Sequence, residues 1–333
     1  MRPTAIKHRG PAEYQSTEAE VPTDAVGRPR VAVLMAVRDG ERFLSQQLDS
    51  LARQSAVGVD LWVSDDGSRD ASVDLLHRVA DSWKLGRVEL VDGPRRGFAE
   101  NFRSLIVRPE IMADFYAFCD QDDVWDEDKL THAIEWLKTQ SVGLAALYCS
   151  RTRIITADGE IVGQSPRFPR PPSFRNAIVQ SIAGGNTMVM NRVAYDLVAE
   201  ASRRTDFVSH DWWVYLIVSG AGGNVYYCSE SRIGYRQHDG NLVGENNTWR
   251  ARVSRLGLLM RGRFKEWNDK NLSGLATCAD LLTDDARRTL ELFIQSREGR
   301  LSVRLLSLWR SGAYRQTILG DWGLYLACIV RRL

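Results

Sequence analysis

The sequence predicts an α/β protein with a mostly parallel central sheet flanked by helices, followed by a helical appendage at its C-terminal end. Short apolar runs of strand length alternate with amphipathic segments over the first 140 residues, and the chain changes character beyond residue 250. Strands covered on both faces read as continuous apolar runs, and helical connections between them make the sheet parallel. Ligands of such sheets bind beyond the carboxyl ends of the strands.

The strand and helix pattern begins after residue 30. Residues 1–30 hold four prolines and no apolar period, so we expect a flexible leader. VAVLMAV at 31–37 has the length of a buried strand, and Leu44, Leu48 and Leu51 then repeat at helical spacing. The alternation continues with strands at 59–66, 87–93 and 114–120, and helices at 73–83, 98–107 and 126–140.

The second half of the chain has a looser pattern. Arginines alternate with apolar residues from 250 to 265, and apolar stretches close the chain, so we expect a helical region at 250–333. Before it we expect a strand within 144–156, a loop at 166–174, a short strand before a helix at 192–203, and a helix at 210–220.

Composition narrows the classes of function. A formal net charge of +2 gives no general case for nucleic acid as a partner. The five cysteines are odd in number and widely spaced, which indicates neither a disulfide framework nor a zinc site. The sequence shows no apolar run of membrane-spanning length and no secretory signal, so we expect a cytoplasmic location.

Acidic residues follow three of the predicted strands. Asp39, the pair Asp65 and Asp66, and the cluster Asp120–Asp123 all stand at carboxyl ends, so we expect them to meet in one crevice. In an extended chain Asp120 and Asp122 point the same way, with Gln121 turned aside. Oxygen ligands of this kind suit Mg²⁺ or Mn²⁺ bound together with substrate phosphates. A solvated acidic loop is the alternative.

The segment SDDGSRD at 64–70 contains a strong turn signal. Turn chemistry accounts for Gly67 and one acid, but it leaves unexplained why two adjacent acids end an apolar strand. One of these carboxylates could accept a hydrogen bond from a nucleotide base or from ribose hydroxyls.

Seven motifs in order resemble those of bacterial family 2 glycosyltransferases, in particular the rhamnosyltransferase-like branch that builds surface polysaccharide. The likeness spans about 31–244, nearly two thirds of the chain. The motifs are VAVLMAVRDGERFLSQQLDSL, WVSDDGSRDAS, GFAENF, FCDQDDVWDEDKL, GGNTMVMN, HDWW and YRQHDGNLVG. The resemblance implies a GT-A catalytic domain at 31–249 and inverting transfer from a nucleotide-diphosphate sugar.

The resemblance also implies roles for individual residues. Asp211 would be the general base, and Val37 with Arg38 departs from the commoner family wording, which weakens the nucleoside assignment there. The nucleotide would contact Ala36, Val37, Asp39, Asp65, Asp66, Asp120 and Gln121; the donor sugar or acceptor would contact Gly185, Asn186, Trp212 and Trp213; the diphosphate would contact Arg236 and His238; and the metal would be held by Asp122, Asp120 and His238.

Several of these residues could instead have a purely structural role. Asp211 could simply complement the dipole of its helix, with Trp212 and Trp213 as core aromatics. His238 could be a structural hydrogen-bonding residue, and Arg236 could supply the cation to phosphate instead. If Asp211 is the base, single displacement requires that it face the metal across the sugar.

The expected donor is dTDP-rhamnose, with a UDP-sugar as the alternative, and the expected acceptor is a saccharide or polyprenyl-linked glycan. The basic segment at 250–265 suggests peripheral contact with the inner membrane face, whereas 322–330 could instead pack against a second copy in a homodimer. Rival functions are a noncatalytic nucleotide-sugar binder and a phosphoacceptor module using Lys129, although such modules are far shorter. The chain lacks dinucleotide-binding and P-loop glycine motifs.

Overall fold

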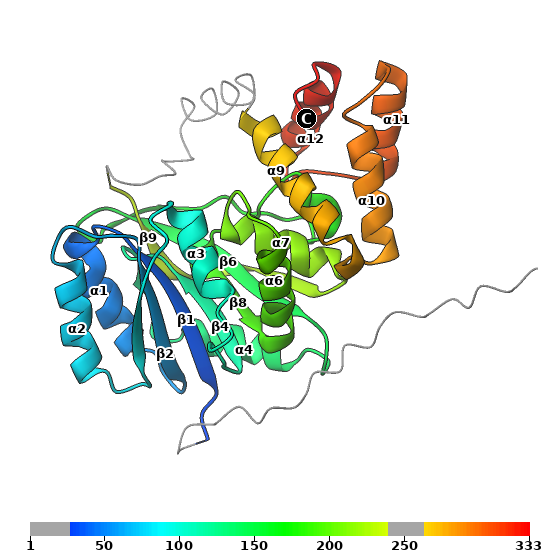
Figure 1. Cartoon of the computed structure of the whole chain (residues 1–333). Helices are drawn as coiled ribbons and strands as arrows, with labels where there is room; N and C mark the ends of the chain where they lie inside the picture. Colours follow the sequence, from blue (N-terminus) through cyan, green and yellow to red (C-terminus); the bar gives the residue numbers. More distant parts are fainter. Residues whose placement is uncertain (1–26, 239–262) are drawn as a thin grey trace, which may run out of the picture.

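The computed structural model describes residues 27–238 and 263–333, and these form a curled sheet flanked by helices (Figure 1). The strand order is β3-β2-β1-β4-β8-β6-β9-β5, with β7 paired to β6. This arrangement confirms the predicted fold class. The strands are β1 (Arg30–Val37), β2 (Gly58–Asp65), β3 (Val88–Asp92), β4 (Phe115–Cys119), β5 (Val124–Trp125), β6 (Ala146–Ile155), β7 (Ile161–Gln164), β8 (Val189–Asn191) and β9 (Asn224–Arg236).

The half of the sheet built from β1 to β4 is parallel. β1 pairs in parallel with β2 on one side and β4 on the other, and β2 pairs in parallel with β3. Val31, Val33 and Met35 are fully buried because helices cover both faces of the strand. The carboxyl ends of these strands therefore meet at one edge, where the acidic residues follow them.

The other half of the sheet is mixed. β8 is antiparallel to both β4 and β6, and β5 is antiparallel to β9, whereas β6 and β9 run parallel. The sequence pattern did not predict β5, β7 or β9. In β9, Ser150 and Arg151 of β6 face Cys228 and Ser231, so that Ser229 and Glu230 fall outside the regular register and interrupt the apolar alternation.

The helices form a layer on each face of the sheet. α1, α2 and α4 pack with one apolar cluster, and α3, α6 and α7 pack with a second cluster on the other face. The helices and 3-10 turns of this region are α1 (Glu41–Ala52), α2 (Ser72–Ser82), α3 (Phe98–Ile106), α4 (Lys129–Lys138), α5 (Phe174–Ala177), η1 (Gly185–Thr187), α6 (Arg192–Arg204) and α7 (His210–Gly220).

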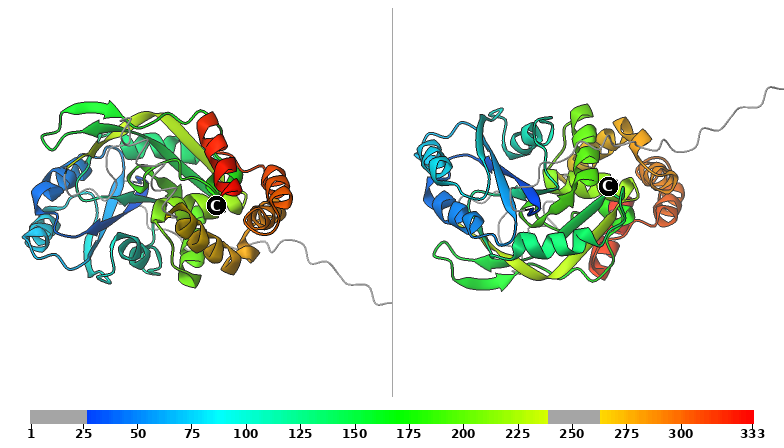
Figure 2. Two further views of the ribbon diagram at one scale, coloured as in Figure 1. Left: turned by 90° about the horizontal axis from the view of Figure 1, so that it is seen from above. Right: turned by 90° about the horizontal axis from the view of Figure 1, so that it is seen from below.

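The C-terminal helices extend the second of these clusters. Leu275, Phe293 and Leu308 are buried in the same apolar cluster as α3, α6 and α7. Seen from above, these helices lie beside the sheet (Figure 2). Among the residues that the structure describes, no helix is long and apolar enough to cross a membrane. The region contains α9 (Arg263–Thr277), η2 (Ala279–Leu281), α10 (Asp284–Gln295), α11 (Leu301–Ser311) and α12 (Ile318–Ile329).

Parts of three expected features lie outside the described residues. They are residues 1–26 of the expected leader, residues 239–249 at the end of the expected catalytic domain, and residues 250–262 of the basic segment expected to touch a membrane.

Candidate active site

The acids that follow β1 and β2 lie side by side at the edge of the crevice. Val37 and Asp65 are register partners, so the two strand ends coincide. Ser68 links the two turns, because its hydroxyl donates to the Asp65 carboxylate and accepts from the Asp39 backbone N at 2.9 Å. Asp39 has a φ of 47°, a left-handed conformation in which aspartate is enriched. Its half-exposed carboxylate accepts a hydrogen bond from the backbone N of Arg69 at 2.8 Å.

Asp66 is the buried member of the pair. Its two oxygens accept hydrogen bonds from the backbone N atoms of Arg95 at 2.6 Å and Gly97 at 2.9 Å. The carboxylate thus holds the loop after β3 against the end of β2. Asp65 likewise accepts from the backbone N atoms of Gly67 and Ser68, as turn chemistry requires.

Gln121 and Val37 have structural contacts that compete with the roles predicted for them. The Gln121 amide accepts from Arg38 N at 2.8 Å and donates to Arg38 O at 3.0 Å, which ties the end of β4 to the end of β1. The Val37 side chain is buried and its carbonyl accepts from Asp66 N. Val37 has no polar side-chain atom for a nucleotide, Gln121 keeps one N–H of its amide, and Ala36 beside them is only partly buried.

The side chains of Asp122 and His238 meet at the end of β9. Asp122 Oδ2 lies 2.8 Å from His238 Nε2, although 116 residues separate them in the chain. His238 also packs against Phe43 of α1, with ring centroids 4.8 Å apart. The structure therefore brings together two of the three predicted metal ligands.

Asp123 is fully buried, and it joins η1 to the end of β9 through hydrogen bonds. Its carboxylate accepts from Asn186 Nδ2 at 2.5 Å and from Arg236 N at 3.2 Å. Burial and the charge of Asp122 raise the pKa of Asp123 to about 7, despite the opposing effect of the Asn186 hydrogen bond. Asn186, predicted to contact sugar or acceptor, is itself buried and directed at this carboxylate.

Arg236 does not offer its guanidinium to a phosphate. The side chain is 1% exposed. Its nitrogens donate to the carbonyl oxygens of Asp122 (2.9 Å), Thr156 (3.2 Å) and Ala157 (2.5 Å), and to Gln46 Oε1 (2.6 Å). These contacts compete with the predicted role of Arg236 at the diphosphate, because every nitrogen of the guanidinium already donates within the protein.

Asp120 and Asp211 are close enough to influence one another. Burial raises the pKa of Asp120 well above its usual value, and the charges of Asp123, Asp122 and Asp211 raise it further. In the described part of the chain no group donates a hydrogen bond to the carboxylate of Asp120 or of Asp211. Both carboxylates are consequently available to a ligand.

A chain of contacts explains how α7 reaches the acidic cluster. Asn186 of η1 binds Asp123, and its neighbour Gly185 lies against His210, the first residue of α7. A Cβ atom at Gly185 would stand 1.9 Å from His210 Nε2. The glycine is needed so that the first turn of α7, which carries Asp211, can pack directly on η1.

His210 is a feature that sequence reasoning left ambiguous. Its ring stacks on Phe102 at 3.7 Å between centroids and contacts the edge of Phe118. Both ring nitrogens are buried and have no hydrogen-bond partner among residues 27–238 and 263–333. Burial lowers the pKa of His210 to about 4, against a smaller opposing effect of the Asp211 charge. The imidazole is therefore neutral at physiological pH.

Trp212 and Trp213 belong to the core. Trp212 Nε1 donates to Ala177 O at 2.7 Å, and Trp213 Nε1 donates to Ser202 Oγ at 3.2 Å. Both indoles are buried. These contacts anchor α7 against α5 and α6, which agrees with the alternative of core aromatics, and the contact of these rings with a sugar stays a prediction.

Two acids that follow Asp120–Asp123 in the chain form ion pairs with arginines of β6 and β9. Asp126 pairs with Arg153 through Nη1 at 2.7 Å, and Asp128 lies 3.2 Å from Arg232 Nε. Lys129 is buried, with Nζ 3.3 Å from the centre of the Trp125 ring, and burial lowers its pKa to about 7. This position does not suit Lys129 to a phosphoacceptor pocket.

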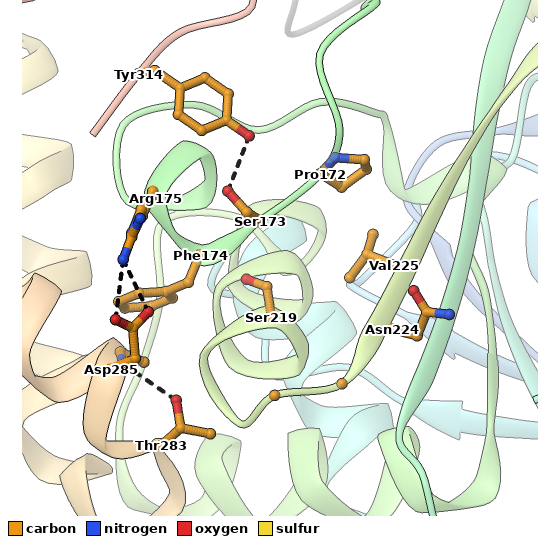
Figure 3. A pocket seen from close by; sticks show the side chains of 13 residues that line it. Pro172, Ser173, Phe174, Arg175, Ser219, Asn224, Val225, Thr283, Asp285 and Tyr314 are labelled. Carbon is orange, nitrogen blue, oxygen red and sulfur yellow. Dashed lines mark hydrogen bonds and ion pairs between the residues drawn. The ribbon is translucent and has the colours of Figure 1, made fainter. Parts of the chain in front are cut away.

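A hollow of about 520 Å³ lies away from these acids, between α5, the turn after α7 and the start of α10 (Figure 3). Arg175 and Asp285 form an ion pair of 3.0 Å across it, and Ser173 Oγ lies 3.0 Å from the Tyr314 hydroxyl. Its lining contains none of the predicted site residues, and we regard it as part of the junction with the C-terminal helices.

The curled α/β sheet with acids at the carboxyl ends of its parallel strands is that of a GT-A glycosyltransferase. S. aureus TarS in complex with UDP-GlcNAc matches with a TM-score of 0.51 and 12% identity, over 86% of this chain and 93% of that one. GalNAc-T7 with UDP, GalNAc and Mn²⁺ matches with a TM-score of 0.50 and 11% identity, over 87% of this chain and 56% of that one. At these identities the likeness concerns the fold alone.

The sequence comparisons give the family. Residues 32–196 match the family described as Glycosyl transferase family 2, so the chain contains a domain of that family. The dTDP-rhamnosyl transferase RfbG of Shigella flexneri is 25% identical over 265 residues, which cover 76% of this chain and 86% of the relative. The predicted family is thus confirmed.

Proposed function

We propose that this glycosyltransferase catalyses inverting transfer of a sugar from a nucleotide-diphosphate donor, with Asp211 as the general base. The observation that supports the proposal most directly is the placement of Asp211. It lies in the first turn of α7, which packs on η1, and its charge acts on Asp120 within the acidic cluster. A base on a separate element from the diphosphate end is the arrangement that in-line displacement needs.

In the proposed reaction the acceptor hydroxyl oxygen forms a bond to the anomeric carbon while the bond from that carbon to the diphosphate oxygen breaks. Asp211 takes the hydroxyl proton, and the diphosphate leaves with the bonding electron pair. Asp211 has no competing hydrogen-bond donor in the described residues, so its oxygens can meet the hydroxyl.

A divalent ion, Mg²⁺ or Mn²⁺, fits the residues beside the diphosphate position. Asp122 and His238 face one another at 2.8 Å and supply one oxygen and one nitrogen ligand. Among the described residues, no three possible ligands lie close enough together to hold an ion by themselves. Asp120 therefore does not complete a three-ligand site with Asp122 and His238. Two protein ligands completed by phosphate oxygens and water match the habit of Mg²⁺. When bound, the ion would offset charge on the departing diphosphate.

The donor we propose is dTDP-rhamnose, because the relative that matches 76% of the chain is named a dTDP-rhamnosyl transferase. A UDP-sugar is the alternative within the same mechanism. Asp39 and the turn around Asp65 stand where the nucleoside would lie, at the ends of β1 and β2. We propose a saccharide or polyprenyl-linked acceptor in surface polysaccharide synthesis.

Thermal unfolding in the presence of sugar nucleotides tests the donor. The protein would be melted with dTDP-rhamnose, dTDP-glucose, UDP-sugars and GDP-mannose, each with and without Mn²⁺. A donor at one hundred times its dissociation constant adds about 2.7 kcal/mol to stability. We expect the largest shift with dTDP-rhamnose and Mn²⁺. If no sugar nucleotide raises the melting temperature, the donor class is wrong.

A further inference from the structure

Helices α11 and α12 leave a broad apolar surface uncovered in the described structure. It is made by Leu306, Trp309, Ile318, Leu319, Trp322 and Leu326, which we name the α11–α12 face. The exposed fractions of Trp309, Leu319 and Trp322 are 69%, 81% and 70%. Two tryptophans and several aliphatic side chains exposed together exceed the scattered apolar residues of an ordinary protein surface.

The spacing in α12 shows that the exposure is organised. Ile318, Trp322 and Leu326 recur every four residues and so share one face of the helix. Leu324 and Cys328 are buried on the opposite side, within the apolar cluster of the protein. The helix is therefore apolar on both sides, and only one of these sides is used by the fold.

Charge identifies the kind of partner. Residues 299–333 contain six arginines and one acidic residue, Asp321. That acid is already occupied, since it pairs with Arg170 at 2.7 Å and accepts from Arg315 N at 2.7 Å. The arginines exposed in this segment are Arg300, Arg310, Arg331 and Arg332. Exposed aliphatic and indole side chains in a segment with this excess of arginine match an interface of acyl chains and anionic headgroups.

A second copy of the chain fits this face less well. In a two-fold dimer the same patch meets itself, so the exposed arginines of both copies would be brought together. One exposed acid, Glu298, precedes α11, and the four exposed arginines outnumber it. We propose that the α11–α12 face rests on an anionic phospholipid surface, which is a different segment from the basic stretch at 250–265.

The position of the face in the fold suits this partner. Figure 1 shows α11 and α12 rising above the sheet, at the same end of the molecule as the start of α1, which follows the carboxyl end of β1. A protein seated on α11 and α12 would hold its acidic crevice near the membrane. The inference concerns surface binding, and it stands whether or not the proposed donor is correct.

Vesicle flotation of the full chain tests the proposal. We expect binding to vesicles of phosphatidylglycerol and phosphatidylcholine, no binding to phosphatidylcholine alone, and weakening as salt screens the arginines. Trp309→Ser with Trp322→Ser should weaken binding at least about tenfold, because each indole anchors at the interface. Both side chains are exposed, so thermal unfolding should be unchanged.

Matched variants make the outcomes distinct. Ile161→Ser with Val162→Ser removes two exposed apolar side chains from β7, far along the chain, and should leave flotation unaltered. Arg331→Gln with Arg332→Gln should shift the loss of binding to lower salt. The proposal is overturned if the protein ignores anionic vesicles, if the double tryptophan variant floats like the wild type, or if that variant instead converts a dimer to a monomer in light scattering.

Discussion

Asn186 Nδ2 lies 2.5 Å from Asp123 Oδ2, and both side chains are almost completely buried. The pair joins η1 to the loop between β4 and β5. Since a buried carboxylate is costly without donors, this contact is a condition for the acidic cluster to form at all.

Replacing Asn186 should therefore lower stability. Asn186→Ala removes one donor from a buried carboxylate and should cost about 1–3 kcal/mol of unfolding free energy in urea denaturation. Asn186→Asp sets two carboxyl groups against each other, which raises their pKa values in the folded state. Its stability should accordingly fall as pH rises above about 4, where the unfolded carboxyls ionise. The exposed Asn224→Ala is the control, and an equal loss there would contradict the assignment.

Asp211→Asn should abolish most of the turnover and leave donor binding intact. Removing a general base costs about a hundredfold or more in kcat, whereas the proposed donor contacts lie on β1, β2 and the cluster. Steady-state kinetics and donor titration measure the two effects separately. Asp206→Asn, an exposed acid paired with Lys270 at 2.9 Å just before α7, is the matched control. Full activity of the Asp211 variant would leave the residue as a helix-capping acid.

Metal affinity should depend on Asp122 and His238. Asp122→Asn or His238→Ala should weaken Mn²⁺ binding in the presence of a nucleoside diphosphate by about tenfold or more. Titration calorimetry gives the affinity directly, without reference to activity. The solvent-facing Asp49→Asn on α1 should behave like the wild type. Unchanged affinity in both site variants would mean that any ion binds elsewhere.

Gly185→Ala should destabilise the first turn of α7. The added Cβ would stand 1.9 Å from His210 Nε2, and the imidazole is held against Phe102. Overpacking of this kind costs about 1–3 kcal/mol. Gly323→Ala is an opposite control, because nothing lies within 4 Å of its Cβ position and it is inside α12. That change should raise stability by about 0.5–1 kcal/mol. Thermal and urea unfolding compare the two.

His210 should make stability fall in mild acid. Its pKa is about 4 in the folded protein and 6.5 in the unfolded chain, so between these values only the unfolded chain binds the proton. The contribution is intact above about pH 6.5, is lost as pH falls towards 4, and amounts to roughly 3 kcal/mol. His210→Gln does not titrate there. The stability difference between wild type and variant should therefore shift by that amount between about pH 8 and pH 4, and a constant difference would refute the assignment.

The sequence pattern predicted the parallel half of the sheet well, because strands buried on both faces leave uninterrupted apolar runs such as 31–37. It missed β9, where Ser229 and Glu230 fall outside the regular pairing and break the alternation that marks a strand. The meeting of Asp122 with His238 depends on β9, so no local pattern could give that distance.

The candidate site residues also differ in how far the sequence could place them. Strand-end position located Asp39, Asp65, Asp66 and Asp120, because topology alone brings such ends together. The polar character of a residue did not reveal whether its side chain forms hydrogen bonds within the protein. Arg236 and Asn186 looked like ligand-binding residues, yet their partners are carbonyls and a carboxylate supplied by distant segments. The need for glycine at position 185 became clear only from the structure, in which the His210 ring lies directly against it.

The guanidinium of Arg236 fastens three separate stretches of chain: α1 through Gln46, the acidic loop through the Asp122 carbonyl, and the β6–β7 hairpin through Thr156 and Ala157. The tip of that hairpin is thereby linked to the acidic cluster. Insertions there, which a surface turn would normally tolerate, should disturb the position of Asp122. Engineering of this enzyme should leave that hairpin at its present length.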